Sequence, residues 1–172
     1  MDKNFSQHSL IQYGRFNEQD LNMINKCRGE HNKLGFSYQL IFIRLFNRTP
    51  CQSPFELVDE IVIYAAMQLS LESDLIRLYT NRQKISAHQK SIITSVQYRH
   101  FHDHTKELLK EFIFQQALQF EPLSLLTIKS ITFLRELKVL IPAQDTLLRI
   151  IRTQRAAARQ LLFDQIHKFL SP

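Results

Sequence analysis

The chain has 172 residues, which is enough for one helical domain or two small ones with a buried core. It carries 22 Lys and Arg against 16 Asp and Glu, and residues 87–172 hold most of the surplus, with 12 basic and seven acidic side chains. This net charge of +6 is typical of proteins that bind a polyanion such as nucleic acid. Two cysteines, Cys27 and Cys51, are too few for a disulfide framework, and no apolar run is long enough to span a membrane, so we expect a cytoplasmic protein.

Helices are the expected secondary structure along the whole chain. Only 3 Gly and 5 Pro interrupt a sequence rich in helix-forming residues such as Leu, Gln, Lys and Arg. We therefore predict an all-α fold, a compact bundle of about eight helices with short connections and helix-turn-helix-like elements. After a loosely held start up to about Ser9, helices are predicted over residues 17–27, 31–46, 54–69, 73–80, 86–98, 103–119, 122–138 and 145–169.

Individual residues mark where several of these helices begin. Asn17 is a good N-cap, because its side chain is expected to accept from the backbone N–H of Asp20. The segment 53–56, with sequence SPFE, has the cap residue, the proline and the glutamate of a strong helix start. Gly29 is expected to adopt the left-handed conformation in a tight break between the first two helices.

The last predicted helix carries a stripe of four arginines. At 100° per residue they fall within about a third of its circumference, with no acid among them. They are Arg149, Arg152, Arg155 and Arg159. Because a guanidinium group presents a planar fork of donors, the stripe predicts contacts to phosphates. With the helix and the short break before it, this region has the general shape of a helix-turn-helix reader. The alternative is a soluble helical hairpin with an arginine-rich outer face.

A second helix-turn-helix candidate lies around Gly29. The helix before it ends near Arg28, and the next one opens with His31, Asn32 and Lys33. Polar and basic side chains in the first turn of a second helix are what contacts to base edges need. The alternative is that His31 and Asn32 only cap the helix.

A third basic stretch runs from residue 79 to residue 84 and is followed by His88. Arg82 and Lys84 are candidates for contacts to a DNA backbone. The pattern alone favours the other interpretation, a solvated loop.

The sequence offers no catalytic chemistry. His100, His102 and His104 alternate in the segment HFHDH, but no Cys pair or carboxylate accompanies them at metal-ligand spacing, so a polar loop before the next helix is expected. Gly-rich phosphate loops, nucleophile elbows and HExxH motifs are missing. We therefore assign no catalytic residue, no metal and no cofactor.

Residues 17–48, which read NEQDLNMINKCRGEHNKLGFSYQLIFIRLFNR, resemble the opening domain of the Tn-three family of replicative bacterial transposases. In that family a stretch of the form EDL…I…RG.HN.LGFA.QL..LR recurs. The matching residues here are Asp20, Leu21, Ile24, Arg28, Gly29, His31, Asn32, Leu34, Gly35, Phe36, Gln39, Leu40 and Arg44. Looser similarity follows at residues 87–92, 98–101 and 139–149, so the resemblance spans about residues 10–163.

The resemblance implies a helical DNA-binding module that recognises the terminal inverted repeats of a transposon during DNA transposition. It also implies that the metal-dependent nuclease lies far downstream, so we expect this chain to bind DNA without cutting it. The expected partner is double-stranded DNA at transposon ends, in the bacterial cytoplasm with the nucleoid, and no small-molecule substrate or membrane is expected. Residues 1–99 are then an N-terminal DNA-binding subdomain and residues 100–172 a C-terminal subdomain with the basic last helix.

The residues expected to contact DNA come from the three basic segments. They are Arg28, His31, Asn32, Lys33, Arg82, Lys84, His88, Arg149, Arg152, Arg155 and Arg159. The four arginines of the last helix are expected to contact phosphates, and residues 31–33 to reach base edges.

An alternative function is a protein-interaction module that regulates a full-length transposase, or pairs with a copy of itself, through apolar helix faces. Its anchors would be Phe112, Phe114, Phe120 and Phe133 if they were exposed, whereas aromatic residues at helical spacing usually belong to a core.

Overall fold

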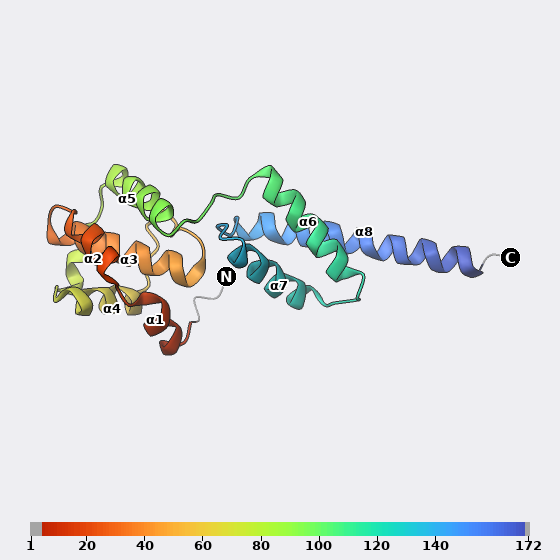
Figure 1. Ribbon diagram of the computed structural model, residues 1–172, viewed down its shortest axis with the longest axis horizontal. Coiled ribbons are helices and arrows are strands. Elements are labelled where there is room, and N and C mark those ends of the chain that lie inside the picture. The colour runs from red at the N-terminus through yellow and green to blue at the C-terminus, as the bar shows by residue number, and fades with distance from the viewer. Residues whose placement is uncertain (1–4, 171–172) are drawn as a thin grey trace. The chain divides into compact units, whose positions relative to one another are not determined.

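The computed structural model describes residues 5–170, and every regular element in that range is a helix. The all-α prediction is therefore confirmed. The described residues divide after Tyr98 into two compact units (Figure 1). Each unit has its own hydrophobic core. We call them unit 1, up to Tyr98, and unit 2, from Arg99 onwards. Within the described range no helix is long and apolar enough to cross a membrane.

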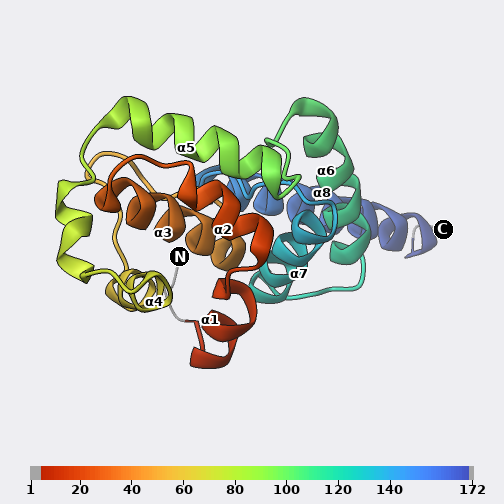
Figure 2. The same ribbon diagram turned by 60° about the vertical axis from the view of Figure 1, so that its left-hand side comes forward.

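Unit 1 is built around one central helix. Its elements, within the described part of the chain, are α1 (Gln7–Gly14), α2 (Glu18–Asn25), α3 (Glu30–Phe46), α4 (Asp59–Leu69), the short 3-10 helix η1 (Ser73–Leu78) and α5 (Arg82–Ser95). The other five elements all contact α3. In two views α3 lies between α5 and α4 (Figures 1 and 2).

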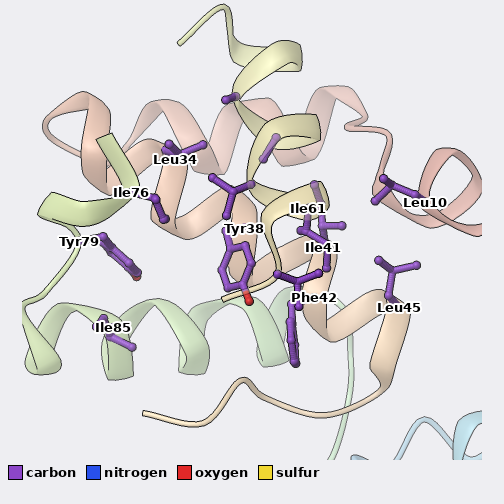
Figure 3. Packing of buried hydrophobic residues seen from close by; sticks show 14 residues of the cluster. Leu10, Leu34, Tyr38, Ile41, Phe42, Leu45, Ile61, Ile76, Tyr79 and Ile85 are labelled. Atoms are coloured by element: carbon purple, nitrogen blue, oxygen red, sulfur yellow. The ribbon is translucent and has the colours of Figure 1, made fainter. Parts of the chain in front are cut away.

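The middle of α3 forms the core of unit 1. Every residue from Leu34 to Ile43 is buried, which is the pattern of a helix surrounded on all sides. Tyr38 and Phe42 lie in the middle of the cluster, with Leu10 on one side and Ile85 on the other (Figure 3). The helix therefore serves as a scaffold, and only its two ends reach the surface.

A buried ion pair joins α2 to the end of α3. Asn17 and Asp20 form the reciprocal N-cap of α2, so the predicted cap is confirmed. The same Asp20 carboxylate, only 2% exposed, receives two hydrogen bonds from Arg44, at 2.9 and 2.7 Å. A buried carboxylate with an incomplete set of partners is costly, and this one is satisfied by the helix start and the guanidinium together.

Unit 2 is a three-helix arrangement of α6 (Asp103–Ala117), α7 (Leu123–Glu136) and α8 (Gln144–Leu170). α6 and α7 both pack against α8, and Leu147, Ile151 and Ala158 contribute its buried face. The second half of α8 extends beyond α6 and α7 (Figures 1 and 2). Backbone hydrogen bonds of 2.8 Å from Arg99 to Lys138 and from Leu140 to Arg99 tie the start of the unit to the break before α8.

The prediction of a loosely held start was wrong from Gln7 onwards. α1 begins there because the side chain of Ser6 caps it by accepting from the backbone N–H of Ser9. Leu10 then enters the core beside α3. The same prediction also covers residues 1–4, which lie outside the described part of the chain. The polar sequence of α1 did not indicate a helix, and the packing of Leu10 against α3 stabilises it.

The helix start predicted at residues 53–56 was also wrong. α4 begins only at Asp59, and residues 52–55 form a turn with a cis Ser53–Pro54 peptide bond. The carboxylate of Glu56, expected to complete a capping box, instead pairs with Arg48 at 2.8 Å and accepts from the backbone N–H of Cys51. Arg48 therefore binds the Glu56 carboxylate that the predicted helix start required.

The predicted start of the next helix at Ser86 was four residues late. Asn81 caps α5 by accepting from the backbone N–H of Lys84, and Ile85 fixes the first turn in the core. Arg82 and Lys84, interpreted from the pattern as part of a loop, therefore belong to a helix.

Candidate nucleic-acid interface

The structure brings two of the three predicted basic segments to one place in unit 1. The end of α2, the turn after it and the first turns of α3 face α5 across a hollow of about 800 Å³. The lining residues are Met23, Lys26, Cys27, Arg28, Asn32, Phe36, Lys84, Ala87, His88, Lys90, Ser91, Thr94 and Ser95. Segments some 50 residues apart in sequence thus share one surface.

The hollow is electropositive. Lys26, Arg28, Lys84 and Lys90 line it, all four are exposed, and the lining contains no acid. Within the part of the chain that the structure describes, none of the four pairs with a carboxylate. Positive charges gathered in a concave surface focus the electric field and attract an anion. On the α5 side, Ser91 adds a hydroxyl donor suited to a phosphate oxygen, whereas the hydroxyls of Thr94 and Ser95 donate to the carbonyl oxygens of Lys90 and Ile92.

The turn that carries Arg28 is held by its neighbours. Gly29 has φ +85°, a conformation that residues with a side chain rarely adopt. Asn32 is only 4% exposed, and its Nδ2 donates to the carbonyl oxygen of Arg28 at 2.7 Å. The ring of His31 lies back over Gly29, and Lys33 donates to the side chain of Asn25 at 3.4 Å. The side-chain amide nitrogen of Asn32 therefore holds the turn in place.

A chain of polar contacts forms the wall behind His88. Nε2 of Gln39 donates to the hydroxyl of Tyr79 at 2.6 Å, and that hydroxyl lies 2.7 Å from Nδ1 of His88. The phenol therefore donates to Nδ1, which leaves the ring proton on Nε2, 3.9 Å from Sγ of Cys27. Burial raises the pKa of Tyr79, so this hydroxyl keeps its proton at neutral pH.

His88 is a neutral part of this wall. Burial, helped by the charge of Lys84, lowers the pKa of its imidazole below the ordinary value, so the ring is uncharged at neutral pH. It stacks on Tyr79, with centroids 5.7 Å apart, and meets the edge of Phe36 at 5.2 Å. His88 therefore lines the hollow as an uncharged ring and adds no positive charge to it at neutral pH.

Gly35 makes this wall possible. A Cβ atom there would lie 2.3 Å from Cγ of the Tyr79 ring, which is far inside van der Waals contact. Only glycine lets Tyr79 approach α3 closely enough to receive the hydrogen bond from Gln39. Gly35 and Gln39, which both lie in the segment 17–48, thus shape the hollow from behind.

Sequence reasoning did not identify Lys26, Lys90, Ser91 or Thr94, although all of them line the hollow. One signal was available, because α5 contains no Asp or Glu along its 14 residues. Arg82 is exposed at the first position of α5 and does not line the hollow.

The third basic segment belongs to α8 of unit 2. Arg149, Arg152 and Arg159 are exposed, and Arg155 is half-buried. Ile150 and its buried neighbours face the core of the unit. The stripe expected from the sequence is therefore a surface of α8.

Other groups offer little chemistry. Among residues 5–170 no cluster of three His, Cys, Asp or Glu side chains could hold a metal ion, and His100, His102 and His104 are all exposed. The phenylalanines considered as interaction anchors differ from one another. Phe112 and Phe133 stack at 4.4 Å against the core of unit 2, whereas Phe120 is 74% exposed.

Comparison with known proteins gives matches along most of the chain. The family model described as Domain of unknown function (DUF4158) matches residues 1–154. Similar curated proteins are the transposase for transposon Tn1546 of Enterococcus faecium, 29% identical over 160 residues, and the transposase for transposon gamma-delta of Escherichia coli (strain K12), 29% identical over 161 residues. A third is the transposase for transposon Tn501 of Pseudomonas aeruginosa, 27% identical over 163 residues. The matches cover 92%, 91% and 91% of this chain, which spans 16% of the length of each relative.

Proposed function

The chain belongs to the family described as Domain of unknown function (DUF4158), and from this premise we propose that it is the part of a transposase that binds the ends of a transposon. The similar proteins are named as transposases, and 16% of their length corresponds to this chain. Recognition of terminal inverted repeats and the absence of cutting by this chain belong to the same proposal.

The observation that carries the proposal is the hollow of unit 1. Its four cations, which have no carboxylate partner among the described residues, come from α5 and from the end of α2 with the turn after it. A duplex has one phosphate charge for about every 1.7 Å of its axis. Lys26 and Arg28 on one side and Lys84 and Lys90 on the other can therefore contact phosphates of one backbone. The arginines of α8 would add a second set of phosphate contacts, and Asn32 would hold the Arg28 turn in place.

The test is fluorescence anisotropy with a duplex carrying the terminal repeat of the encoding transposon and with a scrambled duplex, each across a salt series. We expect preferential binding to the repeat. Four phosphate contacts in the hollow alone correspond to a slope of log K against log salt of about −3 to −4. No binding to either duplex at low salt would overturn the proposal and favour a protein partner.

A pair of matched variants locates the interface. Arg28→Ala combined with Lys84→Ala should weaken binding to both duplexes alike and reduce the salt slope by about two. Arg15→Ala combined with Arg77→Ala removes the same charge from exposed positions of unit 1 outside the hollow. This control should change the affinity and the salt slope only as much as the loss of two positive charges anywhere on the surface does. Equal slopes for the two double variants would show that the hollow is not the interface.

A further inference from the structure

The outward face of α5 is mostly polar and free of acids, aromatic rings and branched aliphatic side chains. It consists of Gln83, Lys84, Ala87, Lys90, Ser91 and Thr94, all exposed. Their spacing of three and four residues places them on one side of the helix. The other side, with Ile85, Ile92 and Ile93, is buried.

These residue types are suited to a DNA groove. A major groove about 12 Å wide admits one helix, provided that the side chains facing the bases are small or slender. Glutamine can make a bidentate contact to adenine, lysine to guanine, and the methyl group of threonine can contact that of thymine. Of the α5 face, Ala87 and Ser91 leave room between Gln83 and Thr94.

The other candidate helices fit less well. α3, the second helix of the motif predicted around Gly29, is buried on all sides from Leu34 to Ile43 and reaches the surface only at its two ends. The α8 stripe consists of arginines at successive turns, and with no neutral amide or hydroxyl among the four it is built for backbone contacts.

α5 is also held firmly from behind. Asn81 caps its first turn, and Gln89 accepts a hydrogen bond of 2.7 Å from Gln52 on its inner side. His88 is fixed between Tyr79 and Phe36. A helix whose rotation is fixed presents the same side chains to every duplex, as sequence readout requires.

We propose that α5 is the helix that enters the major groove, with Gln83 and Thr94 reading base edges and Lys84 and Lys90 contacting the DNA backbone that lies in the hollow beside it. This proposal rests on the proposed function, since it assigns the reading of sequence within the same interface. From Gln83 to Thr94 the helix rises about 16 Å, which corresponds to about five base pairs.

The experiment compares the neutral double variant Gln83→Ala with Thr94→Ala against the intact chain, using the repeat and scrambled duplexes at one salt concentration and then across the salt series. Because the variant changes no charge, its affinity for the scrambled duplex and its salt slope should stay the same. Its affinity for the repeat should fall roughly 10- to 100-fold. Gln12→Ala combined with Gln19→Ala, on the exposed faces of α1 and α2, is the matched control and should keep the preference.

The outcomes separate this proposal from the proposed function. If the intact chain binds with the expected salt dependence and the double variant keeps its preference for the repeat, α5 does not read the sequence, although DNA binding stands. An equal loss on both duplexes would make α5 a backbone contact and overturn the reading role. Failure of the intact chain to bind either duplex would overturn the proposed function itself. An unchanged melting temperature of the double variant would show that its fold is intact.

A second readout locates the contact in the groove. Dimethyl sulfate modifies guanine N7, which lies in the major groove, so α5 should protect guanines within about five adjacent base pairs of the repeat. Protection should be lost in the Gln83 and Thr94 double variant. Protection that is unaffected by these substitutions would assign the groove to another element.

Discussion

At the scale of single residues, buried positions behind and beside the hollow decide its form more than the cations that line it. Gly35 gives its place to the Tyr79 ring, Gln39 holds the hydroxyl of that ring, and Asn32 closes the Arg28 turn. Exposed lysines and arginines can be exchanged at small cost in stability, whereas these buried positions have defined partners.

Gly35→Ala should destabilise unit 1, because the new Cβ atom would overlap the ring of Tyr79. Overpacking of this kind typically costs about 1–3 kcal/mol of unfolding free energy, measurable by urea denaturation. Tyr79→Leu in the same chain should recover part of that loss by removing the ring, giving a coupling energy between the two sites. Strictly additive effects would argue against the contact.

His88 should make the stability of unit 1 depend on pH. Burial and Lys84 lower its pKa in the folded chain below that in the unfolded chain, so the unfolded chain binds the proton more readily between the two values. The unfolding free energy should therefore fall as pH falls from 7.5 through the ordinary histidine range to 5.5.

The comparison that checks this is urea denaturation at several pH values for the intact chain and for His88→Gln, with His100→Gln as an exposed control. The pH dependence should shrink in His88→Gln and persist in His100→Gln. An NMR titration of the His88 ring gives its pKa directly, and a value above the ordinary one would contradict the expectation.

At the scale of elements, unit 1 is a central helix surrounded by partners, and three of these partners, α1, α2 and α5, begin at a side-chain cap. α5 connects the core to the proposed interface through opposite faces of one helix: Ile85 and Ile92 are buried, and Lys90 and Thr94 are exposed. Loosening its first turn therefore affects both stability and the presentation of the outer face.

Asn81→Ala should cost about 1 kcal/mol of unfolding free energy, because it removes the side chain that accepts from the N–H of Lys84. Affinity for DNA should fall with it, because Lys84 lies in the turn that is loosened. Ser6→Ala removes the equivalent cap of α1 and is the matched control. It should show a similar loss of stability with unchanged DNA affinity; equal loss of affinity in both would mean that global stability alone is responsible.

At the scale of the whole molecule, the described chain is two helical units with separate cores. The proposed phosphate contacts lie in both, with the hollow in unit 1 and the arginine stripe in unit 2. Two modules that bind one duplex through a covalent connection gain affinity by effective concentration, and each alone should bind more weakly.

Residues 1–98 and 99–172, expressed separately, should each fold, because each buries its own cluster of apolar side chains. Their amide NMR spectra should superpose on the corresponding signals of the full chain. Unit 1 alone should keep its preference for the repeat with a shallower salt slope, since the α8 arginines are missing. Unfolded spectra for either piece would show that its core depends on the other unit.

Much of the architecture was already present in local patterns. Sparse glycine and proline, helical spacing of apolar residues and the Asn17 cap predicted an all-α chain and the positions of α2, α3 and α6 to α8 within a few residues. These features follow from interactions between residues three or four apart, which a linear pattern shows directly. The resemblance over residues 17–48 to Tn-three family transposases was likewise available from the sequence, and similarity to named transposases confirms it.

Only the tertiary structure decided which groups meet. Nothing local showed that Glu56 would leave a helix start for Arg48, or that Tyr79 would take the space above Gly35. The same holds for the hollow, in which Lys26 and Lys90 belong to one surface although 64 positions separate them. Contacts between distant segments depend on the packing of a whole core, in which many partners compete for each group, and a one-dimensional pattern cannot rank these competitors.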